Sequence, residues 1–140
     1  MEKQSKTVMV FGTFDILHDG HQYFLREAKK LGKKLVVAVA QDSFVETFKN
    51  HPPRHSFKER VRNLERELLA DAIVSGDIVS GSWNVIDFQK PDIIALGYDQ
   101  RELEQSLLAH LKKKNLSIPV IKIPPFKEGS LHSSSLKTNE

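Results

Sequence analysis

Short apolar runs alternate along the chain with longer stretches in which apolar residues recur every three or four positions. Two of the runs, residues 7–11 and 35–40, are continuous, which is typical of strands buried on both faces in a parallel sheet. Residues 72–74, 93–96 and 120–123 predict further strands of the same kind. This alternation of strands with helical segments predicts βαβ units, and therefore an α/β fold with a five-stranded, mainly parallel sheet.

The segments between these runs predict four helices, each with apolar residues at helical spacing and so with one face to bury against the sheet. The residues that mark those faces are Phe24, Ala28 and Leu31; Phe57, Val61, Leu64 and Leu68; Trp83 and Ile86; and Leu103, Leu107, Leu108 and Leu111. Gly32 provides a stop for the first helix. Residues 41–56 contain Pro52-Pro53, which predicts a mobile loop without regular structure.

Length and composition narrow the class of protein. A chain of 140 residues suits one domain, so residues 1–140 are expected to fold as a single unit. Cysteine is absent, which excludes a disulfide framework, a thiolate metal site and a cysteine nucleophile. No apolar stretch approaches the roughly 18 residues needed to cross a bilayer, and the first residues lack the apolar core of a secretory signal. We therefore expect a cytoplasmic protein without a membrane partner.

The formal net charge of +3 is mild and compatible with an anionic ligand. Lysine and arginine are spread along the chain, with one run at Lys112-Lys113-Lys114 that has no aromatic residues interleaved with it. A nucleic-acid surface would need such stacking residues. We interpret the run as the solvated end of a helix, and no nucleic-acid partner is expected.

Three polar clusters follow predicted strands: residues 12–21, residues 97–100 (GYDQ) and residues 132–135 (HSSS). Right-handed crossovers make successive parallel strands point the same way. Their carboxyl ends then form one edge of the sheet, and open α/β sheets bind ligands at that edge. The convergence of the three clusters predicts a binding site there.

The first cluster, GTFDILHDGH, has the chemistry of a phosphate site. Gly12 lets the backbone turn sharply off its strand, and a helix that begins near Asp19 or Gly20 would aim its free amides at an anion. His18 and His21 are three positions apart, so on a helix their rings lie on one side and can donate to phosphate oxygens. The cluster is neither a P-loop nor a GxGxxG fingerprint.

Plainer interpretations of the same residues remain open. Two histidines three positions apart are often surface or helix-capping residues, and Asp15 could serve as a turn residue that bonds its own backbone or could help to position a metal ion held mainly by phosphate. A resident zinc site is not expected, because no further ligand stands at an evident spacing from His18 and His21.

Taken together, Gly12-Thr13-Phe14-Asp15 and His18-x-Gly20-His21 resemble the GTFD–HxGH motif of the cytidylyltransferase-like nucleotidyltransferases. The resemblance extends along nearly the whole chain. Glu59-Arg60 stands where the family has an ER or HR pair, residues 70–74 resemble its VDxV strand, and Ser133-Ser134-Ser135 stands where relatives have ISTT. The resemblance implies a Rossmann-like three-layer sandwich.

The resemblance also implies one reaction, in which an acceptor phosphate attacks the α-phosphorus of an NTP and pyrophosphate leaves. Mg²⁺ would travel with the NTP. The catalytic residues implied are His18, His21 and Lys49. Those implied for the nucleotide are Gly12, Thr13, Phe14, Asp15, Gly20, Gly97, Asp99, Ser134 and Ser135, and those for the acceptor are Arg60 and Lys127.

The loops bear on the choice of acceptor. GYDQ and HSSS look more like the archaeal-type FAD synthases, which move AMP from ATP to FMN, than like the glycerol-3-phosphate cytidylyltransferases. A CTP-dependent cytidylyltransferase of a polyol or sugar phosphate, of the glycerol 3-phosphate type, is the alternative within the family. Phe126, Tyr98 or Trp83 could line a slot for the flavin, although ordinary core packing is the preferred interpretation for Trp83. Relatives have an arginine in the segment before the serine run, whereas in this chain the nearest cation is Lys127. This departure favours the alternative of another class, a non-catalytic nucleotide or flavin sensor. A homodimer is a further possibility that the resemblance suggests.

Overall fold

The computed structural model describes residues 6–15, 17–42, 53–76 and 82–126, and its strands form one sheet. The strands are β1 (Thr7–Gly12), β2 (Lys34–Val39), β3 (Ala72–Ser75), β4 (Ile93–Gly97) and β5 (Val120–Ile123). Their order across the sheet is β3-β2-β1-β4-β5, and every pair is parallel. The predicted five-stranded sheet is confirmed, and among these strands it is parallel throughout.

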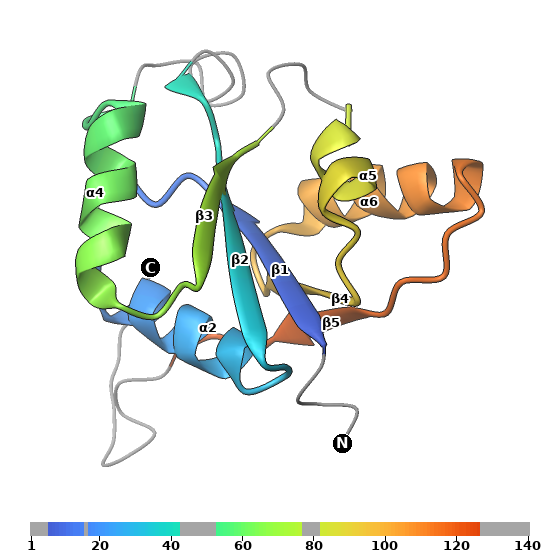
Figure 1. Cartoon of the computed structure of the whole chain (residues 1–140), viewed down its shortest axis with the longest axis horizontal. Helices are drawn as coiled ribbons and strands as arrows, with labels where there is room; N and C mark the ends of the chain where they lie inside the picture. Colours follow the sequence, from blue (N-terminus) through green and yellow to red (C-terminus); the bar gives the residue numbers. More distant parts are fainter. Residues whose placement is uncertain (1–5, 16, 43–52, 77–81, 127–140) are drawn as a thin grey trace.

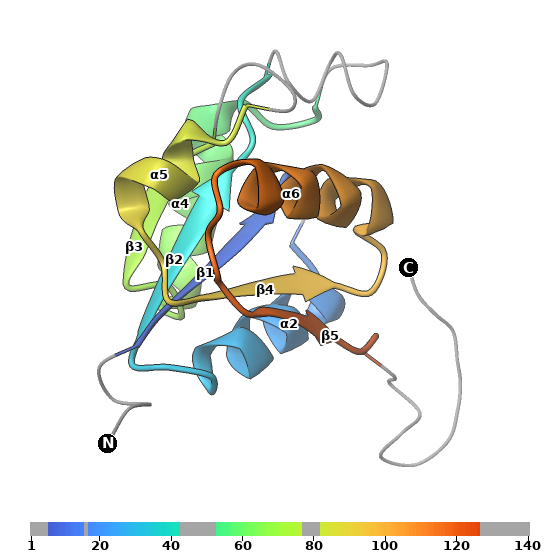
Figure 2. The same ribbon diagram turned by 90° about the vertical axis from the view of Figure 1, so that its right-hand side faces the viewer.

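Helices cover both faces of this sheet (Figures 1 and 2). They are α2 (Asp19–Lys29), α4 (Phe57–Glu67), α5 (Asn84–Gln89) and α6 (Arg101–Lys113). Residues of α2 and α4 belong to one core cluster and residues of α5 and α6 to the other, with the sheet between them. The three-layer, Rossmann-like sandwich implied by the resemblance is therefore confirmed.

The central strand β1 supplies side chains to both cores. Val8 and Val10 lie in the core beneath α2 and α4, whereas Met9 and Phe11 lie in the core beneath α5 and α6. Successive side chains of a strand point to opposite faces, so a continuous apolar run is needed where both faces are covered. This is why TVMVF contains no polar residue after Thr7.

Two predicted core residues lie outside the core. Leu68 was expected on the buried face of its helix, but α4 ends at Glu67 and Leu68 adopts a left-handed conformation with φ of 57°. That turn takes its side chain away from the helical face, and the residue is 86% exposed. Leu108 follows Leu107 on α6 and is 46% exposed, because only Leu107 of the two faces the sheet.

Trp83 lies in the core, which agrees with the preferred interpretation of this residue from the sequence as a core-packing residue. It immediately precedes α5, its ring packs edge-on against Phe11 with 5.2 Å between centroids, and its indole N–H donates to Ser106 Oγ at 3.0 Å. The indole is 7% exposed. It is therefore a packing residue rather than the wall of a flavin slot.

The strand order places a change of direction beside β1. From β1 the chain winds outward through β2 to β3, then returns to the other side of β1 with β4 and continues to β5. Ligands of open α/β sheets bind at such a topological switch point, outside the carboxyl ends of the strands. In this sheet the switch point lies between β1 and β4.

Two remaining expectations concern surfaces. Lys112 and Lys113 form the last turn of α6 with Lys114 at its C-cap, so the lysine run is a helix end, as expected. Of the helices in the residues described above, none is long and apolar enough to cross a bilayer. The predicted loop at residues 41–56 falls mostly on residues 43–52, which lie outside the described ranges.

Candidate functional site

The turn after β1 is built around a close contact between Gly12 and Phe14. A side chain at Gly12 would place its Cβ 2.6 Å from the Phe14 ring, so only glycine fits there. Phe14 itself has φ of 51°, a strained conformation for an aromatic residue. Its ring is buried and meets the His21 ring edge-on at 5.5 Å between centroids. Phe14 thereby supports His21 from within the core.

His18 is the N-cap of α2. Its Nδ1 accepts a hydrogen bond from the backbone amide of Gly20 at 3.0 Å. An accepting Nδ1 carries no proton, so the neutral ring holds its proton on Nε2. The capping bond at Nδ1 therefore selects the tautomer of His18 that has its N–H donor at Nε2, on the side of the ring that faces away from the capped amide. The His18 side chain is exposed.

The two histidines of the motif stack on each other. Their ring centroids are 3.9 Å apart and their planes differ by 28°. The sequence spacing predicts this arrangement on one side of a helix, and the structure confirms it. The pair stands at the N-terminus of α2, the positive end of the helix dipole, which attracts phosphate.

Gly20 is required by this arrangement. A Cβ on Gly20 would lie 2.8 Å from Cε1 and 3.0 Å from Nδ1 of His18. Real Cβ atoms do not approach a neighbour so closely, so the imidazole would have to move. The glycine between the two histidines thus keeps the His18 ring on its capping amide.

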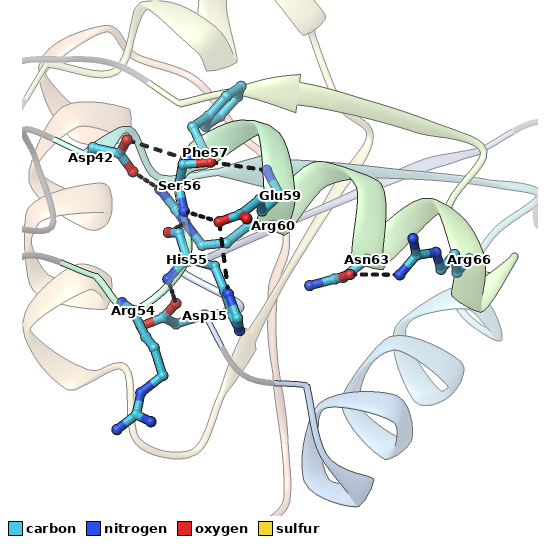
Figure 3. Close-up of polar contacts among 10 residues, drawn as sticks. All are labelled: Asp15, Asp42, Arg54, His55, Ser56, Phe57, Glu59, Arg60, Asn63 and Arg66. Carbon is cyan, nitrogen blue, oxygen red and sulfur yellow. Dashed lines mark hydrogen bonds and ion pairs between the residues drawn. The ribbon is translucent and has the colours of Figure 1, made fainter.

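Asp15 fastens the motif to the start of α4. Its Oδ2 accepts from the Arg54 amide at 2.7 Å and its Oδ1 from the His55 amide at 2.8 Å (Figure 3). Burial opposes ionisation, but these two amides, with the positive charges of His55 and Arg60, outweigh it and lower the pKa of Asp15. Both carboxylate oxygens therefore bind backbone in this structure, while its predicted contact with the nucleotide stays a prediction.

A pH dependence of stability follows from the lowered pKa of Asp15. The stabilisation is present at pH values above the unfolded pKa of about 4 and is lost as pH falls through the lower folded pKa. Asp15→Asn should therefore lower the free energy of unfolding at pH 7, and the difference from the parent protein should shrink as pH falls below about 4. Urea unfolding across pH measures this. Glu65→Gln on the exposed face of α4 is the control, and a gap that persisted at low pH would contradict the assignment.

Arg60 is completely buried and joins three segments. Its Nη1 donates to the Thr13 carbonyl at 2.8 Å. Its Nη2 donates to Asp42 Oδ1 at 2.6 Å and its Nε to the His55 carbonyl at 3.1 Å (Figure 3). Arg60 is 0% exposed here and its guanidinium bonds to protein groups, while its predicted contact with the acceptor stays a prediction. The guanidinium thus ties the turn after β1 to the segment that precedes α4.

The second predicted cluster lies at the carboxyl end of β4. Asp99 and Tyr98 are exposed there, Tyr98 by 50%. Gln100 was not singled out from the sequence, yet its side chain reaches the end of β1: Nε2 donates to the Phe11 carbonyl and Oε1 accepts from the Gly97 amide, both at 2.8 Å. A glutamine at the N-cap of α6, where short polar residues are usual, is the signal that could have drawn attention to it.

Several predicted site residues fall outside the part of the chain that the structure describes. Lys49, Lys127, Ser134 and Ser135 lie outside the described ranges, together with the rest of the HSSS cluster. Phe126, the last residue described, packs against Tyr23 of α2 with 5.4 Å between ring centroids. Within the described part of the chain, no group of three or more histidine, aspartate or glutamate side chains is arranged to hold a metal ion.

Comparisons with known proteins bear on this geometry. The FAD synthase of Thermococcus sibiricus is 43% identical over 123 residues, which cover 88% of this chain and 83% of that protein. The FAD synthase of Thermoplasma volcanium is 42% identical over 130 residues, 91% of this chain and 88% of that protein.

Solved structures agree on the fold. The crystal structure of a lipopolysaccharide core biosynthesis protein from Thermoplasma volcanium superposes with a TM-score of 0.79 at 34% identity, covering 87% of this chain and 98% of that one. The crystal structure of pantoate-beta-alanine ligase from Francisella tularensis superposes with a TM-score of 0.63 at 12% identity, covering 93% of this chain and 66% of that one. At this low identity the similarity concerns the fold alone. The cytidylyltransferase-like family matches residues 9–138, which include the capped, stacked histidines and the Gly12 turn, and the chain belongs to this family.

Proposed function

We propose that this nucleotidyltransferase moves AMP from ATP to FMN, forming FAD and releasing pyrophosphate. The observation that carries the proposal is the stacked pair His18 and His21 at the N-terminus of α2, beside the carboxyl ends of the strands. The identity of 38–43% to archaeal relatives named FAD synthase over most of the chain supports FMN as the acceptor.

The reaction needs no nucleophile from the protein. A phosphate oxygen of FMN attacks the α-phosphorus of ATP, the new P–O bond forms, and the bond to the β-phosphate bridging oxygen breaks as pyrophosphate leaves. Negative charge builds up on the transferring phosphoryl oxygens and on the leaving group. The Nε2–H of His18 and the amides at the start of α2 are donors suited to that charge.

Positioning supplies the other part of catalysis. Arg60 holds the Thr13 carbonyl and Asp15 holds the amides of Arg54 and His55, so the turn after β1 is fixed before substrate arrives. Mg²⁺ bound through the ATP phosphates would neutralise part of their charge and needs few protein ligands. The contacts of Lys49, Lys127, Ser134 and Ser135 with phosphates are part of the same proposal.

Pyrophosphate release tests the function. The purified protein with Mg²⁺ is given ATP or CTP, each combined with FMN, glycerol 3-phosphate or no acceptor, and the flavin product is identified by mass. We expect release with ATP plus FMN and the mass of FAD. Release only with CTP plus glycerol 3-phosphate would keep the reaction and reject the acceptor. Nucleotide binding without release in any combination would favour a sensor.

A further inference from the structure

The two neighbours of β1 pair with it to very different extents. With β2 the register runs through the whole strand, from Thr7 opposite Lys34 to Gly12 opposite Val39, and continues with the Ala40 amide donating to the Gly12 carbonyl. With β4 it covers two positions, Val8 opposite Ile93 and Met9 opposite Ile94. The two strands at the switch point, β1 and β4, therefore part before their carboxyl ends.

The register between β1 and β4 shows which backbone hydrogen bond a regular sheet would form at the point where Gln100 binds. Continued by two residues, it would place Phe11 opposite Leu96. In a parallel ladder a carbonyl accepts from the amide of the residue after its partner, so the Phe11 carbonyl would accept from the Gly97 amide. In the structure these two groups instead bind the two ends of one side-chain amide, that of Gln100.

The Gln100 amide thus takes the place of a peptide group between two strands. It donates to the carbonyl of β1 and accepts from the amide of β4, so neither backbone group loses its partner although the strands are apart. Unpaired backbone groups in a partly buried position would be costly. The side chain is also diverted from its helix, since Gln100 is the N-cap of α6 and makes no side-chain capping bond.

We propose that Gln100 is a positioning residue that sets the separation of β1 and β4 where the nucleotide binds. The inference rests on the proposed function, because that function places ATP at this switch point. The inserted amide keeps the strand ends from closing into a regular ladder. It also holds Gly97, whose α-carbon faces the Asp99 carboxylate so closely that a Cβ there would lie 3.1 Å from Oδ1.

The role depends on the length and on both ends of the side chain. Asparagine has the same amide but one methylene less, so it cannot reach Phe11 and Gly97 together without drawing the strands inward. Glutamate has the same length and still accepts from Gly97, but it presents an oxygen where the Phe11 carbonyl needs a donor. Gln100→Asn should therefore change the distance between β1 and β4 by shortening the side chain, and Gln100→Glu by removing the donor to the Phe11 carbonyl.

Binding of Mg-ATP in the absence of acceptor tests the inference. Dissociation constants, thermal unfolding, and KM and kcat for both substrates are measured for Gln100→Asn, Gln100→Glu and Gln105→Asn, the last a control on the exposed side of α6. We expect both Gln100 variants to bind ATP about tenfold or more weakly. Their KM for ATP should rise further than their KM for FMN, and the control should match the parent protein.

The outcomes separate the two proposals. If the parent protein does not bind ATP, the proposed function fails. If it binds ATP and both Gln100 variants bind within twofold of it, the inference is overturned while the function stands. Equal rises in KM for both substrates, in step with a lower melting temperature, would assign Gln100 a structural role and also overturn it. Gln100→Glu keeps the bond to Gly97 and provides the answer if Gln100→Asn does not fold.

Discussion

His18→Ala is expected to lower kcat by about 10²- to 10⁴-fold, because it removes an N–H donor from the transferring phosphoryl group. The same substitution should also destabilise the protein. His18 Nδ1 accepts from the Gly20 amide as the N-cap of α2, and replacing a side-chain cap by alanine costs about 1 kcal/mol. The structure shows that His18 contributes to stability through the cap.

His18→Asn separates the two roles. Asparagine is among the best N-cap residues but offers no imidazole, so its stability should return to that of the parent protein while kcat stays low. Urea unfolding and single-turnover rates on the same preparations measure both. Recovery of the rate by asparagine would mean that His18 acts through the helix and not on phosphate.

Gly20→Ala is expected to reduce activity by about 100-fold without a loss of stability. Alanine is favoured over glycine in a helix by about 1 kcal/mol, which offsets the loss of about 1 kcal/mol expected when the His18 cap is broken. Its Cβ, however, would meet the His18 ring at 2.8 Å, and the ring is the part that can move. The imidazole should therefore leave its capping amide and its place against His21.

Gly32→Ala is the matched control. There the Cβ would lie 2.7 Å from the Lys6 carbonyl, a backbone atom that cannot move aside easily, at the far end of α2 from His18. This variant should lose stability and keep its activity per folded molecule, the reverse of Gly20→Ala. Melting temperatures and kcat for the two variants together test the pattern. Full activity in Gly20→Ala would show that the His18 position is not critical.

The spacing of apolar residues along the sequence predicts most of this fold. A sheet with a core on each face needs continuous apolar strands, and each helix that covers it needs apolar residues on one face. The prediction fails at Leu68, where the local left-handed turn overrides a regular spacing that would bury the side chain. The motif identifies His18, His21 and Gly20 correctly as neighbours. It cannot reveal that Arg60 is buried or that Gln100 bridges two strands, because those contacts join residues 47 and 89 positions apart.

Arg60 and Asp15 together form a clamp, which bonds the turn after β1 to Asp42 and to the segment before α4. This clamp determines where the chain can accept insertions. Asp42 and residues 53–57 flank the stretch that contains Lys49, and both flanks are bonded to the clamp. Lengthening a chain segment between fixed ends costs little, about 0.6 kcal/mol for each doubling. Insertions between Asp42 and Pro53 that keep Lys49 should leave the stacked pair His18 and His21 undisturbed, because Arg60 and Asp15 hold the turn after β1 independently of this stretch. A new acceptor specificity could therefore be introduced there without moving the two histidines.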